Sequence, residues 1–154
     1  MRVESSKRKL VPERFDLTGT VALVTGAGRG IGAGLALALA EAGADLALVA
    51  RSKEQLEQTA SRITELGRQA MVISADLAEV EEIHRMVGQV IARFKRIDVL
   101  VNAAGTQARK PALEVTEEDW DRVNAVNLKA VYFCSQSVAR QMIQQGRGKI
   151  VNIA

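Results

Sequence analysis

Cysteine, aromatic side chains and long apolar runs are all scarce in this sequence. The single cysteine, Cys134, excludes an internal disulfide and has no metal-ligand partners at useful spacing, so no metal site is expected. This cysteine usage predicts a reducing, cytoplasmic setting. Aromatic residues make up 3% of the chain, so the core must be aliphatic. No apolar run is long enough to span a membrane, and the N-terminus has no signal-peptide core, so no membrane partner is expected.

The sequence also lacks a large excess of charge of one sign. The 154 residues carry a net charge of +3, of which residues 1–16 hold +2 and the remainder +1. A nucleic-acid-binding domain needs a basic face of its own, so composition favours no nucleic-acid partner. We expect an N-terminal arm over residues 1–16 and one domain over residues 17–154. The Ser-Ser-Lys-Arg-Lys cluster of the arm is open to a partner-binding role, although a solvated terminus is favoured.

The most informative stretch runs from Val21 to Gly32. A short apolar run, typical of a buried strand, ends in Thr25 and a glycine-rich turn, and a helix is predicted over 33–42. The turn has the spacing Gly-x-x-x-Gly-x-Gly rather than the commoner Gly-x-Gly-x-x-Gly. Glycine permits close backbone approach to a ligand, and a helix start presents free N–H groups to a diphosphate. The stretch therefore predicts nucleotide binding.

Apolar runs and amphipathic helices alternate along the rest of the chain. Further strands are predicted at 45–50, 69–75, 97–101 and 149–153, with helices between them. The predicted fold class is α/β, a doubly wound parallel sheet of the Rossmann type that stops at its fifth strand. Ser52 and Gln55 are expected to form a capping box and Asp76 to cap the next helix. A long helical region is predicted from Thr116 to about Gln145.

These segments together resemble the short-chain dehydrogenase/reductase family. The segments that carry the resemblance, from about Phe15 onward, are Thr25–Gly32, Asp76–Leu77, Asp98–Gly105, Asn127–Leu128 and Gly148–Ile153. They occur in the family's order and approximate spacing. The resemblance implies an NAD(P) cofactor and hydride transfer between its nicotinamide and a small-molecule carbonyl or alcohol.

Two departures from the family pattern are visible. Ala103 stands where the family commonly has a second asparagine, although Asn102 and Gly105 remain. The family's catalytic Ser and Tyr-x-x-x-Lys are not matched, because Tyr132 is followed four residues on by Gln136. We therefore expect the cofactor-binding part of a longer oxidoreductase, an incomplete Rossmann-like domain. A non-catalytic nucleotide-binding or interaction protein, a truncated family member, is the alternative.

The resemblance assigns cofactor contacts residue by residue. The candidates are Thr25, Gly26, Gly28, Arg29, Gly30, Ile31, Gly32, Arg51, Asp76, Leu77, Asn102, Ala103, Ala104 and Gly105. In the family Asp76 would contact the adenine amino group and Leu77 would border the ring. Ala50 ends the second strand, where NAD-preferring relatives have an acidic residue for the ribose hydroxyls. Arg29 and Arg51 offer two guanidiniums to a 2′-phosphate, so NADP is expected over NAD.

The long helix has further implied roles. Asn127 matches the family's active-site asparagine, a catalytic residue that holds a water in a proton relay, whereas Asn124 is interpreted as structural. Family members associate through this helix, so a homo-oligomer through residues 116–145 is expected. Trp120, Tyr132 and Cys134 are interpreted as packing residues of the helical region.

Overall fold

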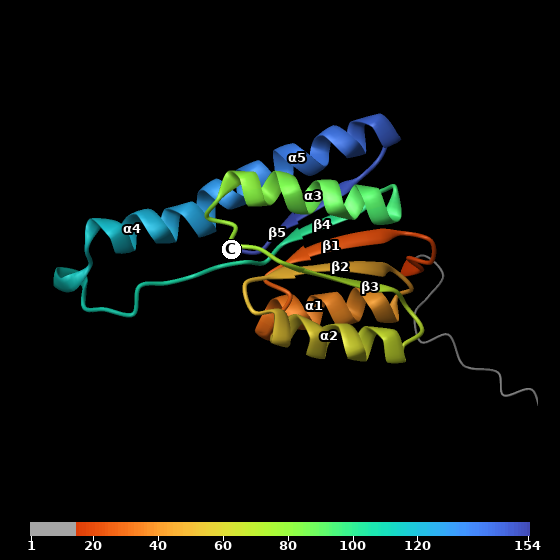
Figure 1. The fold of residues 1–154 in the computed structure, drawn as a ribbon, viewed down its shortest axis with the longest axis horizontal. Coiled ribbons are helices and arrows are strands. Elements are labelled where there is room, and N and C mark those ends of the chain that lie inside the picture. Colours follow the sequence, from red (N-terminus) through yellow and green to blue (C-terminus); the bar gives the residue numbers. More distant parts are fainter. Residues whose placement is uncertain (1–14) are drawn as a thin grey trace, which may run out of the picture.

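Five parallel strands form one sheet in the order β3-β2-β1-β4-β5 (Figure 1). The computed structural model describes residues 15–154, so residues 1–14 of the expected arm lie outside the described part. The strands are β1 (Val21–Thr25), β2 (Asp45–Ala50), β3 (Ala70–Ser74), β4 (Val99–Asn102) and β5 (Lys149–Asn152). The predicted doubly wound parallel sheet is confirmed.

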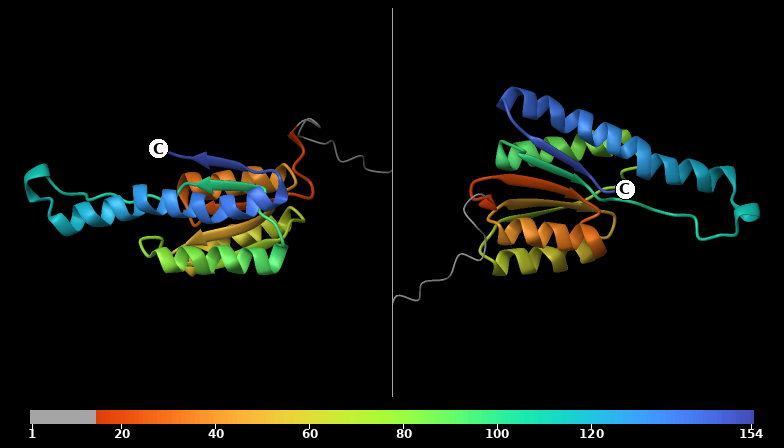
Figure 2. Two further views of the ribbon diagram at one scale, coloured as in Figure 1. Left: turned by 90° about the horizontal axis from the view of Figure 1, so that it is seen from above. Right: turned by 180° about the vertical axis from the view of Figure 1, so that it is seen from behind.

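Helices cover both faces of this sheet (Figure 2). Those of one face are α1 (Gly30–Glu41) and α2 (Lys53–Glu65), and those of the other are α3 (Val80–Phe94) and α5 (Ala130–Gln145). Every residue of β1 is buried, as a strand covered on both faces requires. Leu23 packs into the cluster that includes Ile83 of α3, whereas Val24 packs into the one that includes Leu56 of α2. Successive side chains of β1 therefore pack into the core on opposite faces of the sheet.

Both layers of the core are aliphatic, as the low aromatic content predicts. The largest fully buried side chains are leucines, isoleucines, valines and Met86. Cys134 belongs to this core, and burial raises the pKa of its thiol to about 12. The packing role predicted for Cys134 is confirmed. Within residues 15–154, no helix is both long and apolar enough to cross a membrane.

The helix starts differ in part from the sequence predictions. Ser52 Oγ accepts a hydrogen bond from the Gln55 N–H at 3.4 Å, but the Gln55 side chain lines a pocket and does not complete the capping box. The prediction that Asp76 caps α3 is wrong. Asp76 Oδ1 accepts from the Ala78 N–H at 3.1 Å, so the chain makes a local turn first and α3 begins only at Val80.

The predicted helical region from 116 to 145 is a continuous rod of three segments. α4 (Glu117–Asn124) begins with a complete capping box, a π-helical segment η3 (Ala125–Lys129) follows, and α5 completes the rod. A 3-10 turn, η2 (Ala112–Glu114), precedes it, and η2 and α4 project beyond the sheet (Figure 1). No residue of η2 or α4 is buried. Trp120 is 66% exposed and Tyr132 on α5 is 61% exposed, so the packing roles predicted for them are wrong within this chain.

Asp98 joins the strands at the amino-terminal edge of the sheet. Its buried carboxylate accepts from the Val21 N–H at 2.9 Å and from Arg96 through two bonds of 2.7 and 2.6 Å. Arg147, just before β5, lies 3.7 Å from the same carboxylate. Burial opposes the charged form, but the hydrogen bonds from Arg96 and Val21 and the two positive charges outweigh it. They hold the pKa of Asp98 below its usual value.

Asp98→Ala is expected to lower the free energy of unfolding at pH 7 by roughly 2–4 kcal/mol, because it leaves the Val21 N–H and the Arg96 guanidinium without their acceptor. The pKa of Asp98 is depressed by folding, so its contribution is present above the ordinary value of 3.8 and declines as the pH falls below it. Urea unfolding of both proteins from pH 7 to pH 3 measures this. Equal stability of the two proteins at pH 7 would contradict the assignment.

Candidate nucleotide-binding site

The carboxyl ends of β1, β2 and β4 meet at one open pocket. β1 pairs with β2 on one side and β4 on the other, and the following helices lie on opposite faces of the sheet. This arrangement is the topological switch point at which open α/β sheets bind ligands. The pocket has a volume of about 520 Å³. Twelve of the fourteen predicted cofactor-binding residues line it: Gly26, Gly28, Arg29, Gly30, Ile31, Gly32, Arg51, Asp76, Leu77, Ala103, Ala104 and Gly105.

The other two predicted residues, Thr25 and Asn102, are buried behind the pocket wall. Thr25 Oγ1 accepts hydrogen bonds from the N–H groups of Ala103 and Ala104 at 3.1 and 3.2 Å. Asn102 Nδ2 donates to the side-chain oxygens of Ser135 on α5 and Asn152 on β5, at 3.1 and 2.9 Å. The polar atoms of both residues therefore hold the loop after β4 in position from inside the protein.

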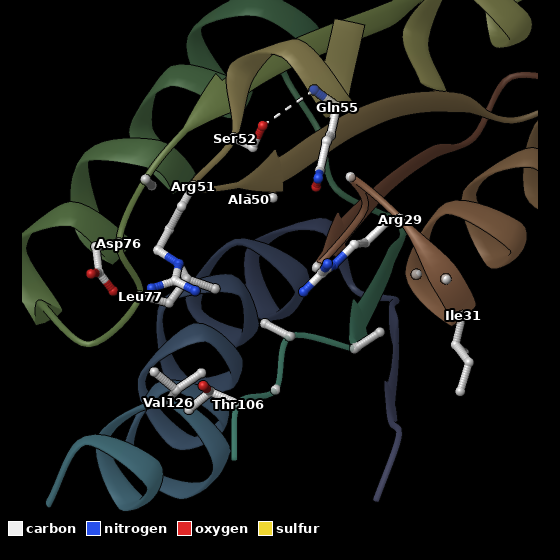
Figure 3. A pocket seen from close by; sticks show the side chains of 18 residues that line it. Arg29, Ile31, Ala50, Arg51, Ser52, Gln55, Asp76, Leu77, Thr106 and Val126 are labelled. Carbon is white, nitrogen blue, oxygen red and sulfur yellow. Dashed lines mark hydrogen bonds between the residues drawn. The ribbon is translucent and has the colours of Figure 1, made fainter. Parts of the chain in front are cut away.

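Six further residues complete the lining: Ala50, Ser52, Gln55, Ala75, Thr106 and Val126 (Figure 3). From the sequence, Ala50 is notable only for the carboxylate it lacks, and Ser52 and Gln55 only as a helix cap. Their position directly after β2 was the signal that they face the crevice. No comparable local signal marked Thr106 and Val126, which the fold brings together from a loop and a helix.

Two glycines of the turn after β1 are required by close backbone contacts. A Cβ on Gly32 would lie 2.2 Å from the carbonyl oxygen of Gly26, inside any allowed contact. A Cβ on Gly26 would lie 2.6 Å from the carbonyl oxygen of Ala103, and Gly26 also has a φ of +69°. The turn, the first turn of α1 and the loop after β4 thus meet backbone to backbone at the base of the pocket.

The amino terminus of α1 opens into this pocket without a side-chain cap. Arg29 occupies the N-cap position and makes no capping hydrogen bond, and the first turn of the helix has no acidic residue. The free N–H groups and the positive end of the helix dipole are therefore available to an anionic ligand. This chemistry fits the diphosphate of a dinucleotide.

Two guanidiniums extend over the same pocket. Figure 3 shows Arg29 and Arg51 reaching into it, from the start of α1 and from the position after β2. Within residues 15–154, neither side chain has an ion-pair partner. The backbone of Arg51 is fixed, because its carbonyl oxygen accepts from Ser74 Oγ at 2.9 Å. Ala50, the last residue of β2, brings a methyl group and no carboxylate to this end of the pocket.

Asp76 and Leu77 form the part of the pocket that follows β3. Leu77 is buried, whereas the Asp76 carboxylate accepts from Ala78 N–H and lies 3.5 Å from the guanidinium of Arg122 on α4. The Asp76 N–H donates to Glu82 Oε2 at 3.1 Å. At this end of the pocket, Leu77 therefore contributes an apolar side chain, and Asp76 contributes a hydrogen-bond acceptor whose position is fixed.

Asn127 lies in the π-helical segment and binds the loop that forms the pocket wall. Its Oδ1 accepts from the Thr106 N–H at 2.8 Å, and its Nδ2 donates to the Thr106 carbonyl oxygen at 2.9 Å. π-helical insertions occur frequently at functional sites. Asn124 instead donates to the carbonyl oxygen of Trp120 in its own helix, at 2.9 Å. Asn124 is therefore held within its own helix, whereas Asn127 binds the pocket wall, and a proton relay at Asn127 stays a prediction.

Gly32→Ala is expected to weaken binding of NADPH by about tenfold or more, because its Cβ would displace the turn that carries the helix amides. Gly34→Ala is the matched control on the same helix, since a Cβ there meets no atom within 4 Å. That control should bind normally and gain about 0.5–1 kcal/mol of stability. Fluorescence titration and thermal unfolding measure both effects. Normal binding by Gly32→Ala would show that the turn does not hold the ligand.

Comparison with known proteins places this architecture in a family. The family model described as short chain dehydrogenase matches residues 20–154. The 2-dehydro-3-deoxy-D-gluconate 5-dehydrogenase of Dickeya dadantii is 41% identical over 146 residues, which are 94% of this chain and 57% of that protein. The chain therefore spans about half the length of the curated relatives it matches.

Several solved structures resemble this chain in both fold and sequence. A metagenomic short-chain oxidoreductase in complex with NADP aligns with a TM-score of 0.86 and 40% identity, over 90% of this chain and 63% of that one. An NAD⁺-bound xylitol dehydrogenase aligns with a TM-score of 0.84 and 38% identity, over 88% of this chain and 53% of that one. Because the family model matches residues 20–154, which are most of this chain, the chain belongs to the short-chain dehydrogenase family.

Proposed function

We propose that this chain forms the cofactor-binding part of an NADP(H)-dependent oxidoreductase that interconverts a small-molecule carbonyl and the corresponding alcohol. Family membership and the uncapped helix terminus at the switch point support a nicotinamide dinucleotide as the ligand. The observation that carries the preference for NADP is the pair of guanidiniums of Arg29 and Arg51 beside Ala50, which have no ion-pair partner among the described residues. Solved relatives include both an NADP complex and an NAD⁺ complex.

Each part of the lining has a proposed role. The N–H groups at the start of α1 hold the diphosphate, and Arg29 and Arg51 hold the 2′-phosphate. The backbone of Ala103 to Gly105 lies along a ribose, Leu77 borders the adenine, and the Asp76 carboxylate accepts from its amino group. When bound, the cofactor supplies the hydride acceptor or donor of the reaction. This chain's own residues bind and orient it.

Other parts of the machinery remain predictions. Tyr132 lines a separate hollow with Arg122 and Lys129 and is not among the residues that line the nucleotide pocket. It does not match the Tyr-x-x-x-Lys motif, because the residue four positions on is Gln136. Three points stay predictions: the catalytic role of Asn127, a cytoplasmic location, and the absence of a nucleic-acid partner. The family assignment favours an oxidoreductase over the non-catalytic alternative.

Titration with both nucleotides tests the cofactor proposal. NADPH is expected to bind about 10–100 times tighter than NADH, the range given by charge-assisted hydrogen bonds to one phosphate. Arg51→Asp should reverse this order, because a carboxylate repels the phosphate and accepts from the ribose hydroxyls. Lys53→Asp is the control, since this exposed lysine pairs with Glu57 outside the pocket. Equal affinity for the two nucleotides, or tighter NADH, would refute the preference for NADP.

We propose further that the exposed face of the helical rod joins two copies of the chain. Trp120, Leu128 and Tyr132 expose 61–68% of their surface on this rod. α4 begins with Glu117 and Glu118, and η3 ends with Lys129. Antiparallel contact of two rods about a two-fold axis would bring opposite charges together around these apolar side chains.

Leu128→Glu is expected to convert the associated protein to monomer, since a carboxylate would be buried at the centre of that contact. Leu66→Glu, at the exposed end of α2 on the other face of the sheet, should leave association unchanged. Sedimentation equilibrium of the three proteins measures this. A monomeric parent chain at all concentrations, or dissociation by both variants, would argue against this contact.

A further inference from the structure

Gln55 lies over the glycine turn and not against its own helix end. It stands in the first turn of α2, and its side chain lines the nucleotide pocket between Ala50 and Arg29 (Figure 3). A Cβ on Gly28 would lie 3.1 Å from Gln55 Cβ, 3.2 Å from Gln55 Oε1 and 3.5 Å from Ala50 Cβ. The side chain is thus packed directly on the backbone that follows β1.

The carboxamide of Gln55 has no hydrogen-bond partner among the described residues. Its backbone N–H is used by Ser52 Oγ, but its side-chain oxygen and NH₂ group bind neither Ser52 nor Arg29. The side chain is half-buried and lines the pocket, so its donor and acceptor atoms are available to a ligand bound there. A polar group in such a position is satisfied by a bound ligand or by water.

The position of this carboxamide indicates which part of a ligand it meets. The end of β2 is where Rossmann proteins bind the adenosine ribose, commonly through a carboxylate on that strand. Here Ala50 leaves that space open, and Arg29, Arg51 and Gln55 surround it. A neutral amide adds a donor beside the two guanidiniums without adding a charge.

Resting on the proposed function, we infer that Gln55 is a specificity-determining residue for the adenosine 2′ position. Its Nε2 donates to an oxygen of the 2′-phosphate, and its packing on Gly28 keeps that donor in place. The charge at position 55 then decides how well a 2′-phosphate is tolerated. A glutamate of the same shape would set a carboxylate against the phosphate, whereas a ribose hydroxyl would be accepted.

Gln55→Glu is the direct test, with Gln58→Glu as its matched control. Gln58 lies one turn of helix from the pocket lining, is exposed, and undergoes the same change of charge. Titration of the parent chain and both variants with NADPH and NADH should show weaker NADPH binding by about tenfold or more in Gln55→Glu alone. NADH affinity should stay within about twofold in all three proteins, and thermal unfolding confirms that each is folded.

The outcomes separate this inference from the function on which it rests. If Gln55→Glu leaves NADPH binding unchanged, weakens both nucleotides alike, or is matched by Gln58→Glu, Gln55 does not determine specificity. The cofactor proposal would stand in that case. If the parent chain binds neither nucleotide, the proposed function is itself wrong and the inference fails with it.

Discussion

Direct backbone contact between the turn after β1 and the loop after β4 is the constraint on which the pocket depends. The contact leaves no room for a Cβ on Gly26 or Gly32, and the buried hydroxyl of Thr25 accepts from two N–H groups of the loop. These interactions bring the start of α1 to the carboxyl edge of the sheet with its amides uncovered. A site for an anion follows from the absence of side chains at this point as much as from the residues present.

Side chains of the helical rod also bind the backbone on both sides of β4, and each of them makes the same pair of hydrogen bonds. Asn127 binds both the N–H and the carbonyl oxygen of Thr106, and Gln145 binds both groups of Ile97, at 3.0 and 2.9 Å. Two carboxamides on one rod therefore hold the chain on either side of β4. Because Thr106 lines the pocket, the position of the rod and the shape of the nucleotide site are mechanically connected.

Much of this arrangement was predictable from the sequence, because its signals are local. Buried strands, a glycine turn and amphipathic helices are each encoded by neighbouring residues, and their alternation leaves few topologies. Twelve of the predicted cofactor residues line one pocket for the same reason: they directly follow strands whose carboxyl ends share an edge. Thr25 and Asn102 end β1 and β4 at this edge, but their polar side-chain atoms bind other groups of the protein.

The parts that were not predictable depend on contacts between distant segments. Aspartate is a common N-cap residue, but Asp76 Oδ1 accepts a hydrogen bond from the Ala78 N–H in a turn that precedes α3. Tryptophan is a large apolar residue that usually packs in a core, but α4 projects beyond the sheet and leaves the Trp120 side chain exposed. Gln55 matches a capping box in sequence, and only the approach of Gly28 shows that its side chain is directed elsewhere.

We propose that peptide N–H groups at the start of α1 and in the loop after β4 together hold a nicotinamide dinucleotide. An NMR titration of the ¹⁵N-labelled chain with NADPH tests it most directly, since it reports on each backbone amide. We predict that the largest shifts fall on residues 26–33 and 103–106, while those around Asp98, at the opposite edge of the sheet, stay in place. Absence of shifts, or their concentration away from the glycine turn, would contradict this account.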